Sequence, residues 1–236
     1  MRVHVFPYAG GAAAAARDWD GRLGPDVCVA PVALPGRDGL FNKQALTDHR
    51  EAVAYLRRTL VPTLEPPFAF YGHSMGAHLA FEVARDLRRL GLPEPVHLFV
   101  SGASAPQFGP PRPNAHLPDD RFVARLRELG GTPDAVLEHE ELLAFLLPLL
   151  RADFALAESY RYVEEPPLEC PLSVWGGTDD GHGPERLEPW REQTTGRFRL
   201  RMLRGGHFFI RERRDELLEA LEDDLIRSSP LVAIAS

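Results

Sequence analysis

The order of hydrophobic and polar positions along the chain predicts strands and helices that follow one another in turn. Five short apolar runs have the character of buried strands, and a sixth alternates apolar residues with arginines: 3–6, 27–32, 68–71, 96–100, 172–175 and 198–203. Helical spacing predicts helices over 12–23, over 47–61, after residue 74 and over 211–226. Strand, helix and strand in this order imply a parallel sheet, so we expect an α/β fold.

One segment interrupts this alternation. Five prolines between residues 106 and 118 are too closely spaced for a regular element, and two helices are predicted beyond them, at about 119–129 and 134–157. We expect residues 106–165 to fold over the top of the sheet as a helical lid, inserted into a single domain that spans residues 1–236. The second helix is apolar on nearly every face, which fits either contact with an apolar ligand or plain burial with a kink at Pro148.

Composition excludes several classes of protein. A chain of 236 residues with 44% hydrophobic residues can bury a sizeable core, and its net charge of −7 comes from interspersed acids and bases, which argues against a nucleic-acid partner. The chain has no long apolar stretch, so we expect neither a membrane segment nor export. Cys28 and Cys170 are expected to be buried thiols rather than a disulfide or a metal site, which suits the cytoplasm.

The best candidate for chemistry is the turn Gly72-His-Ser-Met-Gly76, which joins the predicted strand at 68–71 to an apolar helical stripe. This is the G-x-S-x-G pattern in the strand-to-helix context that the pattern requires. Such a turn strains the backbone of its serine and holds the hydroxyl out at the top of the sheet. We therefore expect Ser74 to be a nucleophile, and the alternative is a plain serine in a tight glycine turn.

A serine hydroxyl needs a base to take its proton and an acid to orient that base. The chain offers Ser74, then Asp179 or Asp180, then His207, each after a predicted strand, and this is the order that the α/β-hydrolase fold uses. We prefer Asp180 because it lies one step further beyond its strand, and Asp179 stays open. His182 is a rival base, but no strand of its own precedes it.

The negative oxygen that forms when a hydroxyl attacks a carbonyl needs N–H donors already in place. In this fold one donor is the residue after the nucleophile, here Met75, and the other lies in the loop after an early strand. We expect Ala9 to supply the second N–H, although Tyr8 and Gly10 are close enough to be confused with it.

With these residues in place, the chain resembles the type II thioesterases of polyketide and nonribosomal peptide biosynthesis. Seven phrases carry the resemblance: Phe6-Pro-Tyr-Ala-Gly-Gly11, Leu34-Pro-Gly-Arg37, Gly72-His-Ser-Met-Gly76, Leu129-Gly-Gly-Thr-Pro133, Leu150-Arg-Ala-Asp153, Gly176-Gly-Thr-Asp-Asp180 and Gly205-Gly-His-Phe-Phe209. The sequence departs from the usual pattern after Arg37 and after Asp180, where it has Asp38-Gly-Leu-Phe41 and Gly181-His-Gly-Pro184.

The resemblance implies an enzyme that hydrolyses acyl groups from the phosphopantetheine arm of an acyl or peptidyl carrier protein, and so clears stalled or misprimed synthases. It also implies that no metal and no organic cofactor takes part. The competing interpretations are a thioesterase that releases or cyclises a finished product, a carboxylesterase for small esters, and a catalytically silent partner of a synthase.

Overall fold

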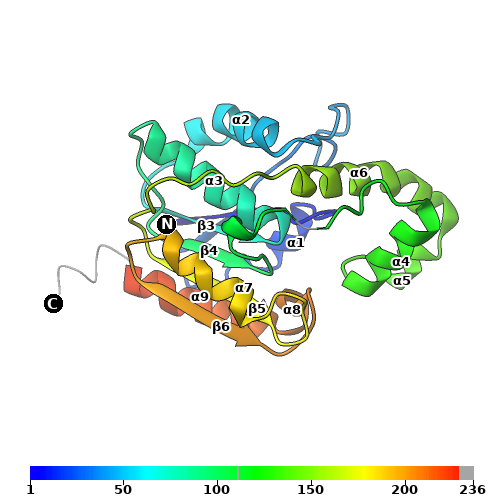
Figure 1. Ribbon diagram of the computed structural model, residues 1–236. Coiled ribbons are helices and arrows are strands. Elements are labelled where there is room, and N and C mark those ends of the chain that lie inside the picture. The colour runs from blue at the N-terminus through cyan, green and yellow to red at the C-terminus, as the bar shows by residue number, and fades with distance from the viewer. Residues whose placement is uncertain (111, 229–236) are drawn as a thin grey trace.

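A parallel sheet of six strands runs through the computed structural model, which describes residues 1–110 and 112–228 (Figure 1). The strand order is β2-β1-β3-β4-β5-β6, and every neighbouring pair is parallel. The strands are β1 Arg2–Phe6, β2 Cys28–Pro31, β3 Phe68–His73, β4 Leu98–Ser101, β5 Leu172–Gly177 and β6 Phe198–Leu203. The expected α/β class is confirmed.

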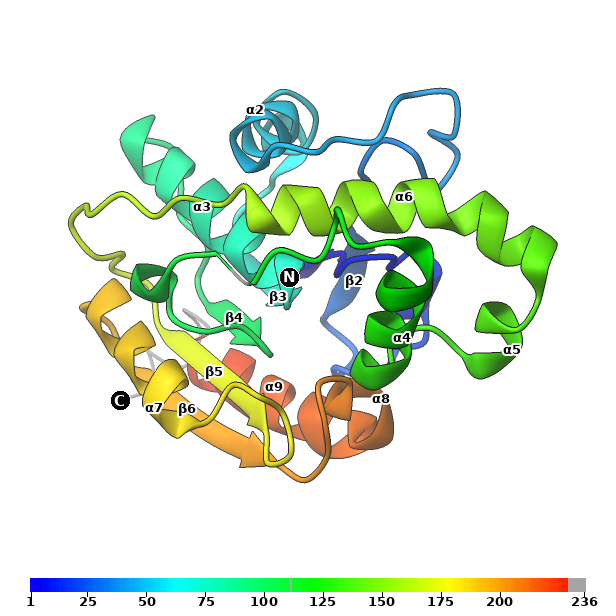
Figure 2. The ribbon, with the colours of Figure 1, turned by 45° about the vertical axis from the view of Figure 1, so that its right-hand side comes forward.

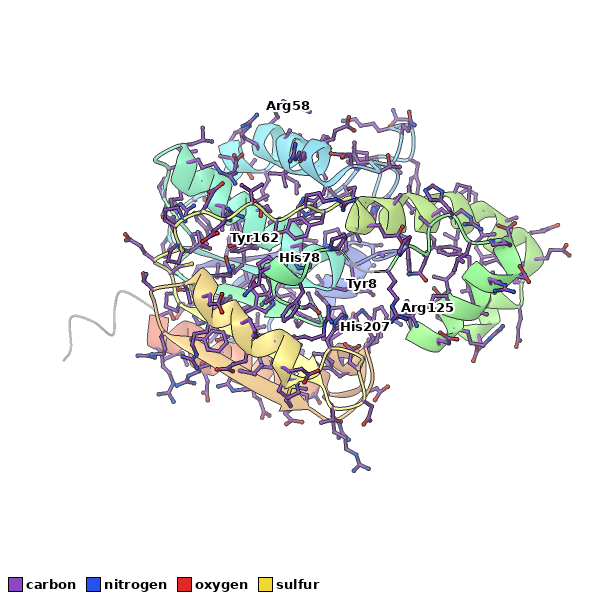
Figure 3. All side chains as sticks on the ribbon, in the orientation of Figure 1. Tyr8, Arg58, His78, Arg125, Tyr162 and His207 are labelled. Atoms are coloured by element: carbon purple, nitrogen blue, oxygen red, sulfur yellow. The ribbon has the colours of Figure 1, made fainter. Side chains whose placement is uncertain are left out.

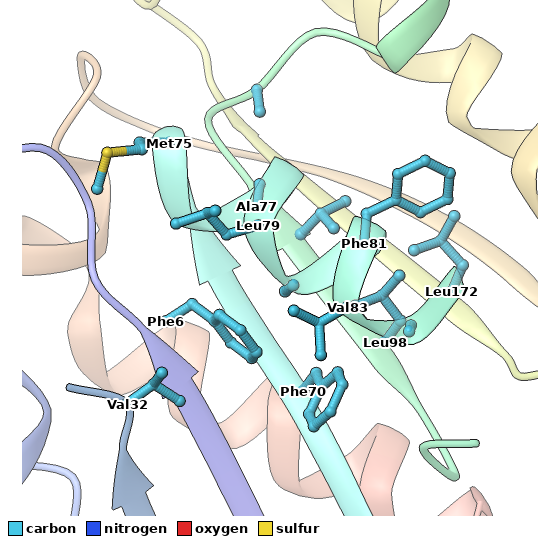
Figure 4. Close-up of a cluster of buried hydrophobic side chains, with 14 of the residues drawn as sticks. Phe6, Val32, Phe70, Met75, Ala77, Leu79, Phe81, Val83, Leu98 and Leu172 are labelled. Carbon is cyan, nitrogen blue, oxygen red and sulfur yellow. The ribbon is translucent and has the colours of Figure 1, made fainter. Parts of the chain in front are cut away.

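Helices cover both faces of this sheet. On one face α2 (His49–Thr59) and α3 (Met75–Arg89) cover a core that includes Phe6, Phe70 and Leu98. Figure 4 shows these three side chains beside α3. On the other face α9 (Arg214–Ser228) packs against the sheet, and short helices α1 (Ala14–Arg17) and α8 (Phe209–Glu212) lie beside it. The smaller elements are η1 Val61–Thr63, η2 Pro106–Phe108, α7 Pro184–Leu187 and η3 Glu188–Gln193.

The segment between β4 and β5 carries three helices of its own, α4 (Asp119–Leu129), α5 (Asp134–Leu137) and α6 (Glu140–Glu158), which project beyond the sheet (Figure 2). Residues 106–165 are called the inserted segment below; Pro111, one of its prolines, lies outside the described residues. The single helix expected at 134–157 is divided because the His139 side chain accepts the Leu142 N–H and starts a new helix. Along α6 the exposed part comes first, with Phe145 69% exposed, whereas Leu150, Asp153 and Leu156 are buried.

Several expectations about local structure are corrected. The helix expected over 12–23 is only the four residues of α1, and the one expected over 211–226 is divided between α8 and α9. Cys170 is buried as expected, but Cys28 is exposed because it begins β2, which lies at the edge of the sheet. In the part of the chain that the structure describes, no helix is long and apolar enough to cross a membrane.

Candidate active site

The turn that presents Ser74 joins the end of β3 to the start of α3. Ser74 has φ 54° and ψ −118°, a strained conformation for a residue with a side chain. A Cβ atom on Gly72 would lie 2.1 Å from the carbonyl oxygen of Gly76, so the tight bend requires the glycine. The fully buried β3 and the long α3 hold this bend rigidly between them. The strain expected from the sequence is therefore present.

Three side chains from separate strand ends form one hydrogen-bonded line. His207, which follows β6, places Nε2 3.0 Å from the Ser74 Oγ. Its other nitrogen, Nδ1, lies 2.8 Å from the Oδ2 of Asp180, which follows β5. When the Nδ1–H donates a hydrogen bond to the carboxylate, Nε2 carries no proton and can accept the proton of the serine. The arrangement is that of a nucleophile, a general base and an orienting acid.

The structure separates the two candidate acids. Asp180 directs its side chain, only 6% exposed, at His207. Asp179 is exposed and accepts a hydrogen bond from the Thr178 hydroxyl at 3.2 Å. Burial raises the pKa of Asp180, but the hydrogen bond and the nearby charge of His207 outweigh it and hold the pKa of this carboxyl below its ordinary value. Asp180 is therefore ionised at neutral pH and able to stabilise a protonated imidazole.

Two further histidines lie near His207. The His73 side chain is buried beneath the site, where Nδ1 lies 2.9 Å from the Ser101 Oγ, and burial holds the pKa of His73 well below its ordinary value. His182 places Nδ1 2.8 Å from the Ser104 Oγ, and its ring centre is 5.8 Å from that of His207. His207, and not His182, is the histidine bonded to Ser74.

Among the described residues, Asp180, His182 and His207 could also hold a metal ion, since their ligand atoms lie within 4.8 Å of one another. In this structure, however, Asp180 and His207 are already bonded to each other. An ion could bind these atoms only by breaking the line to Ser74, so the geometry favours proton transfer at this site.

The two backbone N–H groups expected to serve an oxyanion, those of Ala9 and Met75, belong to residues near Ser74. Within the described chain, the N–H groups of Met75 and Ala9 donate no hydrogen bond to protein. The N–H of Gly10, one of the alternatives to Ala9, is already donated to the Asp153 Oδ2 at 2.7 Å, so Gly10 is excluded in this arrangement. Tyr8, the other alternative, lines the same small cavity as Ala9 and Ser74. Figure 3 shows Tyr8 close to His207.

The cavity at Ser74 has a volume of about 40 Å³. Its far wall comes from the inserted segment: Leu126, Leu129, Gly131, Thr132 and Phe154. The near wall is formed by Tyr8, Ala9, His207 and Phe208. This space admits water but not an acyl chain. In this conformation the inserted segment therefore leaves too little space beside Ser74 for an acyl chain.

Comparison with known proteins decides the family, because residues 1–225 match the model of the thioesterase domain. The chain belongs to the thioesterase family. Thioesterases are hydrolases that act on thioester bonds, and this protein is an enzyme of that class.

Named relatives support the assignment. The thioesterase is 42% identical over 221 residues to the gramicidin S biosynthesis protein GrsT of Aneurinibacillus migulanus, covering 93% of this chain and 86% of the relative. Its fold matches RedJ, a thioesterase of prodiginine biosynthesis in Streptomyces coelicolor, with a TM-score of 0.89 and 41% identity over 94% of this chain and 84% of RedJ. The type II thioesterase BorB of the borrelidin cluster matches with a TM-score of 0.86 and 37% identity, covering 94% and 91% of the two chains. The expected α/β-hydrolase fold is confirmed by these neighbours.

Sequence reasoning missed two charged residues that the thioesterase buries next to its candidate site. Arg37 and Asp153 are 3% and 0% exposed and bind each other, although both were noted only as parts of family phrases. One signal was available in the sequence: Arg37 follows the apolar Leu34-Pro-Gly36 and Asp153 lies in a mainly apolar helix, and charged residues in such places are expected to find a partner when they are buried.

Proposed function

We propose that this thioesterase hydrolyses acyl groups carried as thioesters on the phosphopantetheine arm of an acyl or peptidyl carrier protein, and that it edits stalled or misprimed synthases. Ser74 is the nucleophile, His207 the general base and Asp180 the orienting acid. The observation that carries the proposal is the unbroken hydrogen-bonded line from Asp180 through His207 to Ser74. A cytoplasmic location is part of the same proposal.

The reaction proceeds in two halves. The Ser74 Oγ attacks the thioester carbon while His207 Nε2 takes the hydroxyl proton, and the N–H groups of Met75 and Ala9 stabilise the oxyanion. The pantetheine thiol then leaves with the proton from His207. In the second half His207 removes a proton from water and the hydroxide attacks the acyl-serine. The bond between the acyl carbon and the Ser74 Oγ then breaks, His207 returns its proton to this oxygen, and the free acid leaves. These steps balance without a metal or an organic cofactor.

The small size of the cavity indicates how substrate must enter. Since about 40 Å³ cannot hold an acylated arm, the part of the inserted segment that carries Leu126, Leu129, Gly131 and Thr132 has to move away from Ser74 before acylation. We assign the inserted segment (residues 106–165) the role of a lid within the single domain. The first half of α6, where Phe145 is 69% exposed, is less buried than the second half, which carries Leu150, Asp153 and Leu156.

The substrate class follows from the relatives. GrsT is named for gramicidin S biosynthesis and BorB as the type II thioesterase of the borrelidin cluster, and the resemblance to type II thioesterases implies carrier-bound acyl groups as substrates. The chain covers 86% of GrsT and 91% of BorB, so the likeness extends over most of both relatives. BorB is described as a type II thioesterase, the class that the sequence resemblance links to editing, so we favour editing over product release.

Turnover of three substrates with the same acyl group tests the proposal: the acylated carrier protein, the acyl-CoA and the nitrophenyl ester. We expect the highest kcat/KM for the carrier protein. A wide preference for the nitrophenyl ester would instead identify a carboxylesterase. Failure of a fluorophosphonate to label Ser74 would identify a catalytically silent partner.

A further inference from the structure

Two family phrases that the proposed mechanism leaves without a role meet inside the protein. Arg37 ends the phrase Leu34-Pro-Gly-Arg37, and Asp153 lies in the second half of α6, 116 residues further along the chain. Nη1 of Arg37 donates to the Asp153 Oδ2 at 2.9 Å, and Nη2 donates to Oδ1, so the pair is bidentate. Arg37 is 3% exposed and Asp153 is 0% exposed, which leaves little solvent to screen the pair.

Both residues also hold the loop Pro7–Gly11, which contains the proposed oxyanion donor. Asp153 accepts the Gly10 N–H at 2.7 Å, and Nη1 of Arg37 donates to the Gly11 carbonyl at 3.1 Å. Helix α6 packs directly on this loop, since a Cβ atom on Gly10 would lie 2.5 Å from Cδ2 of Leu150. The backbone is therefore fixed immediately after Ala9, whose own N–H donates to no described protein group.

We propose that Arg37 and Asp153 are positioning residues that orient the Ala9 N–H toward the oxyanion. The inference rests on the proposed function, because it assumes a tetrahedral intermediate at Ser74. By taking the Gly10 N–H, Asp153 fixes the orientation of the Ala9–Gly10 peptide and keeps this donor from competing for the oxyanion. Arg37 holds the carbonyl of the next residue, Gly11. An oxyanion donor acts only when it is held in place before the charge develops.

The position of Asp153 on α6 suits this role. Pro148 lies within α6, and the buried residues Leu150, Asp153 and Leu156 all follow it. The half of α6 that carries Asp153 is thus anchored to the body of the protein, whereas the half before Pro148 carries the exposed Phe145. A lid that moves its exposed half can leave the loop Pro7–Gly11 in place.

The test compares two variants. The one expected to be less stable is expected to be the more active, so an effect on stability can be told apart from an effect on catalysis. Asp153→Asn keeps an oxygen for the Gly10 N–H but leaves the Arg37 charge unpaired, so it is strongly destabilising. The double variant Arg37→Met with Asp153→Leu removes both charges, which restores stability relative to Asp153→Asn, but it leaves no acceptor for Gly10. Asp119→Asn, in the exposed ion pair of Asp119 with Arg151, is the matched control in the same segment.

We expect the double variant to lose about 10²-fold in kcat with KM within about threefold, because a donor displaced by about 1 Å loses most of its effect. Asp153→Asn should lose less activity, about tenfold, although it melts at the lower temperature. The inhibition constant of phenylboronic acid, which forms a tetrahedral adduct with the active serine, should rise in each variant by the same factor as kcat falls. The control should match the wild type in all three measurements.

Wild-type kcat and boronate binding in a folded double variant would overturn the proposal. So would activities that follow the melting temperatures, with Asp153→Asn the less active variant, because the pair would then serve stability alone. If the wild type binds the boronate but hydrolyses none of the thioesters, the proposed function is wrong. The inhibition constants of the variants still decide whether Arg37 and Asp153 position the Ala9 N–H. If the wild type neither binds the boronate nor hydrolyses a thioester, both proposals are wrong.

Discussion

Replacing Asp180 by asparagine tests the proposed hydrogen-bonded line from Asp180 through His207 to Ser74. The sequence alone left both Asp179 and Asp180 as candidates for the acid. The carboxylate lies 2.8 Å from Nδ1 of His207. An asparagine of the same shape can turn its amide toward Nδ1, and the imidazole then carries its proton on Nε2. In that tautomer His207 has no lone pair for the Ser74 proton, 3.0 Å away.

The magnitude follows from this change of tautomer. The same substitution in a Ser-His-Asp protease lowers kcat about 10⁴-fold, which corresponds to about 5.4 kcal/mol of transition-state stabilisation. The environment here is comparable, since Asp180 and His207 side chains are only 6% and 10% exposed and their interaction is weakly screened. We therefore expect Asp180→Asn to lose about 10⁴-fold in kcat. KM should change little, because Asp180 does not line the cavity at Ser74.

Asp179→Asn is the matched control. Asp179 lies in the same loop, is exposed and is bonded through its side chain to Thr178, so the variant should retain activity within about threefold. The assay is thiol release from an acyl-CoA, followed with a disulfide reagent, for both variants and the wild type. More than a tenth of wild-type activity in Asp180→Asn would refute the reasoning. So would a large loss in Asp179→Asn together with a small one in Asp180→Asn.

Two further predictions concern histidines. His207→Ala should lose about as much activity as removal of the nucleophile, whereas His182→Ala should stay within about threefold of the wild type in the same thiol-release assay; the reverse pattern would transfer the base role to His182. Acid should unfold the protein, because burial lowers the pKa of His4 to about 4 and the pKa values of His49 and His97 to about 3, so the unfolded state binds more protons as the pH falls below 6.5. The protonation of each of these three histidines in the unfolded state should lower the free energy of unfolding by about 2 kcal/mol between pH 7.5 and pH 5. Urea titrations at the two pH values measure this loss, and the same loss in His97→Asn would contradict the assignment to His97.

Much of the site could be predicted because parallel strands bring their C-terminal ends to one edge of the sheet. Ser74, Asp180 and His207 each follow a strand that the apolar pattern predicts. The order of these strands was therefore enough to predict that the three residues lie close together. The choice of Asp180 over Asp179 required coordinates, since adjacent residues of a loop point in directions that no periodicity fixes.

Other features depended on contacts that patterning does not encode. The boundary between α5 and α6 depends on the side chain of His139, which caps the start of α6. The hydrophobic pattern does not show this cap, so it predicted one helix in place of two. Cys28 lies in an apolar run, but the edge position of β2 exposes it. The pair of Arg37 and Asp153 joins residues 116 positions apart, and only the folded chain shows that both hold one loop.

The most direct test of the central claim is the hydrolysis of an acylated carrier protein by Ser74→Ala, compared with the wild type at equal concentration. Removal of a serine nucleophile costs about 10⁶-fold in kcat, so the account predicts no detectable release of acid by the variant, with an unchanged melting temperature. Release by Ser74→Ala within tenfold of the wild-type rate would contradict it.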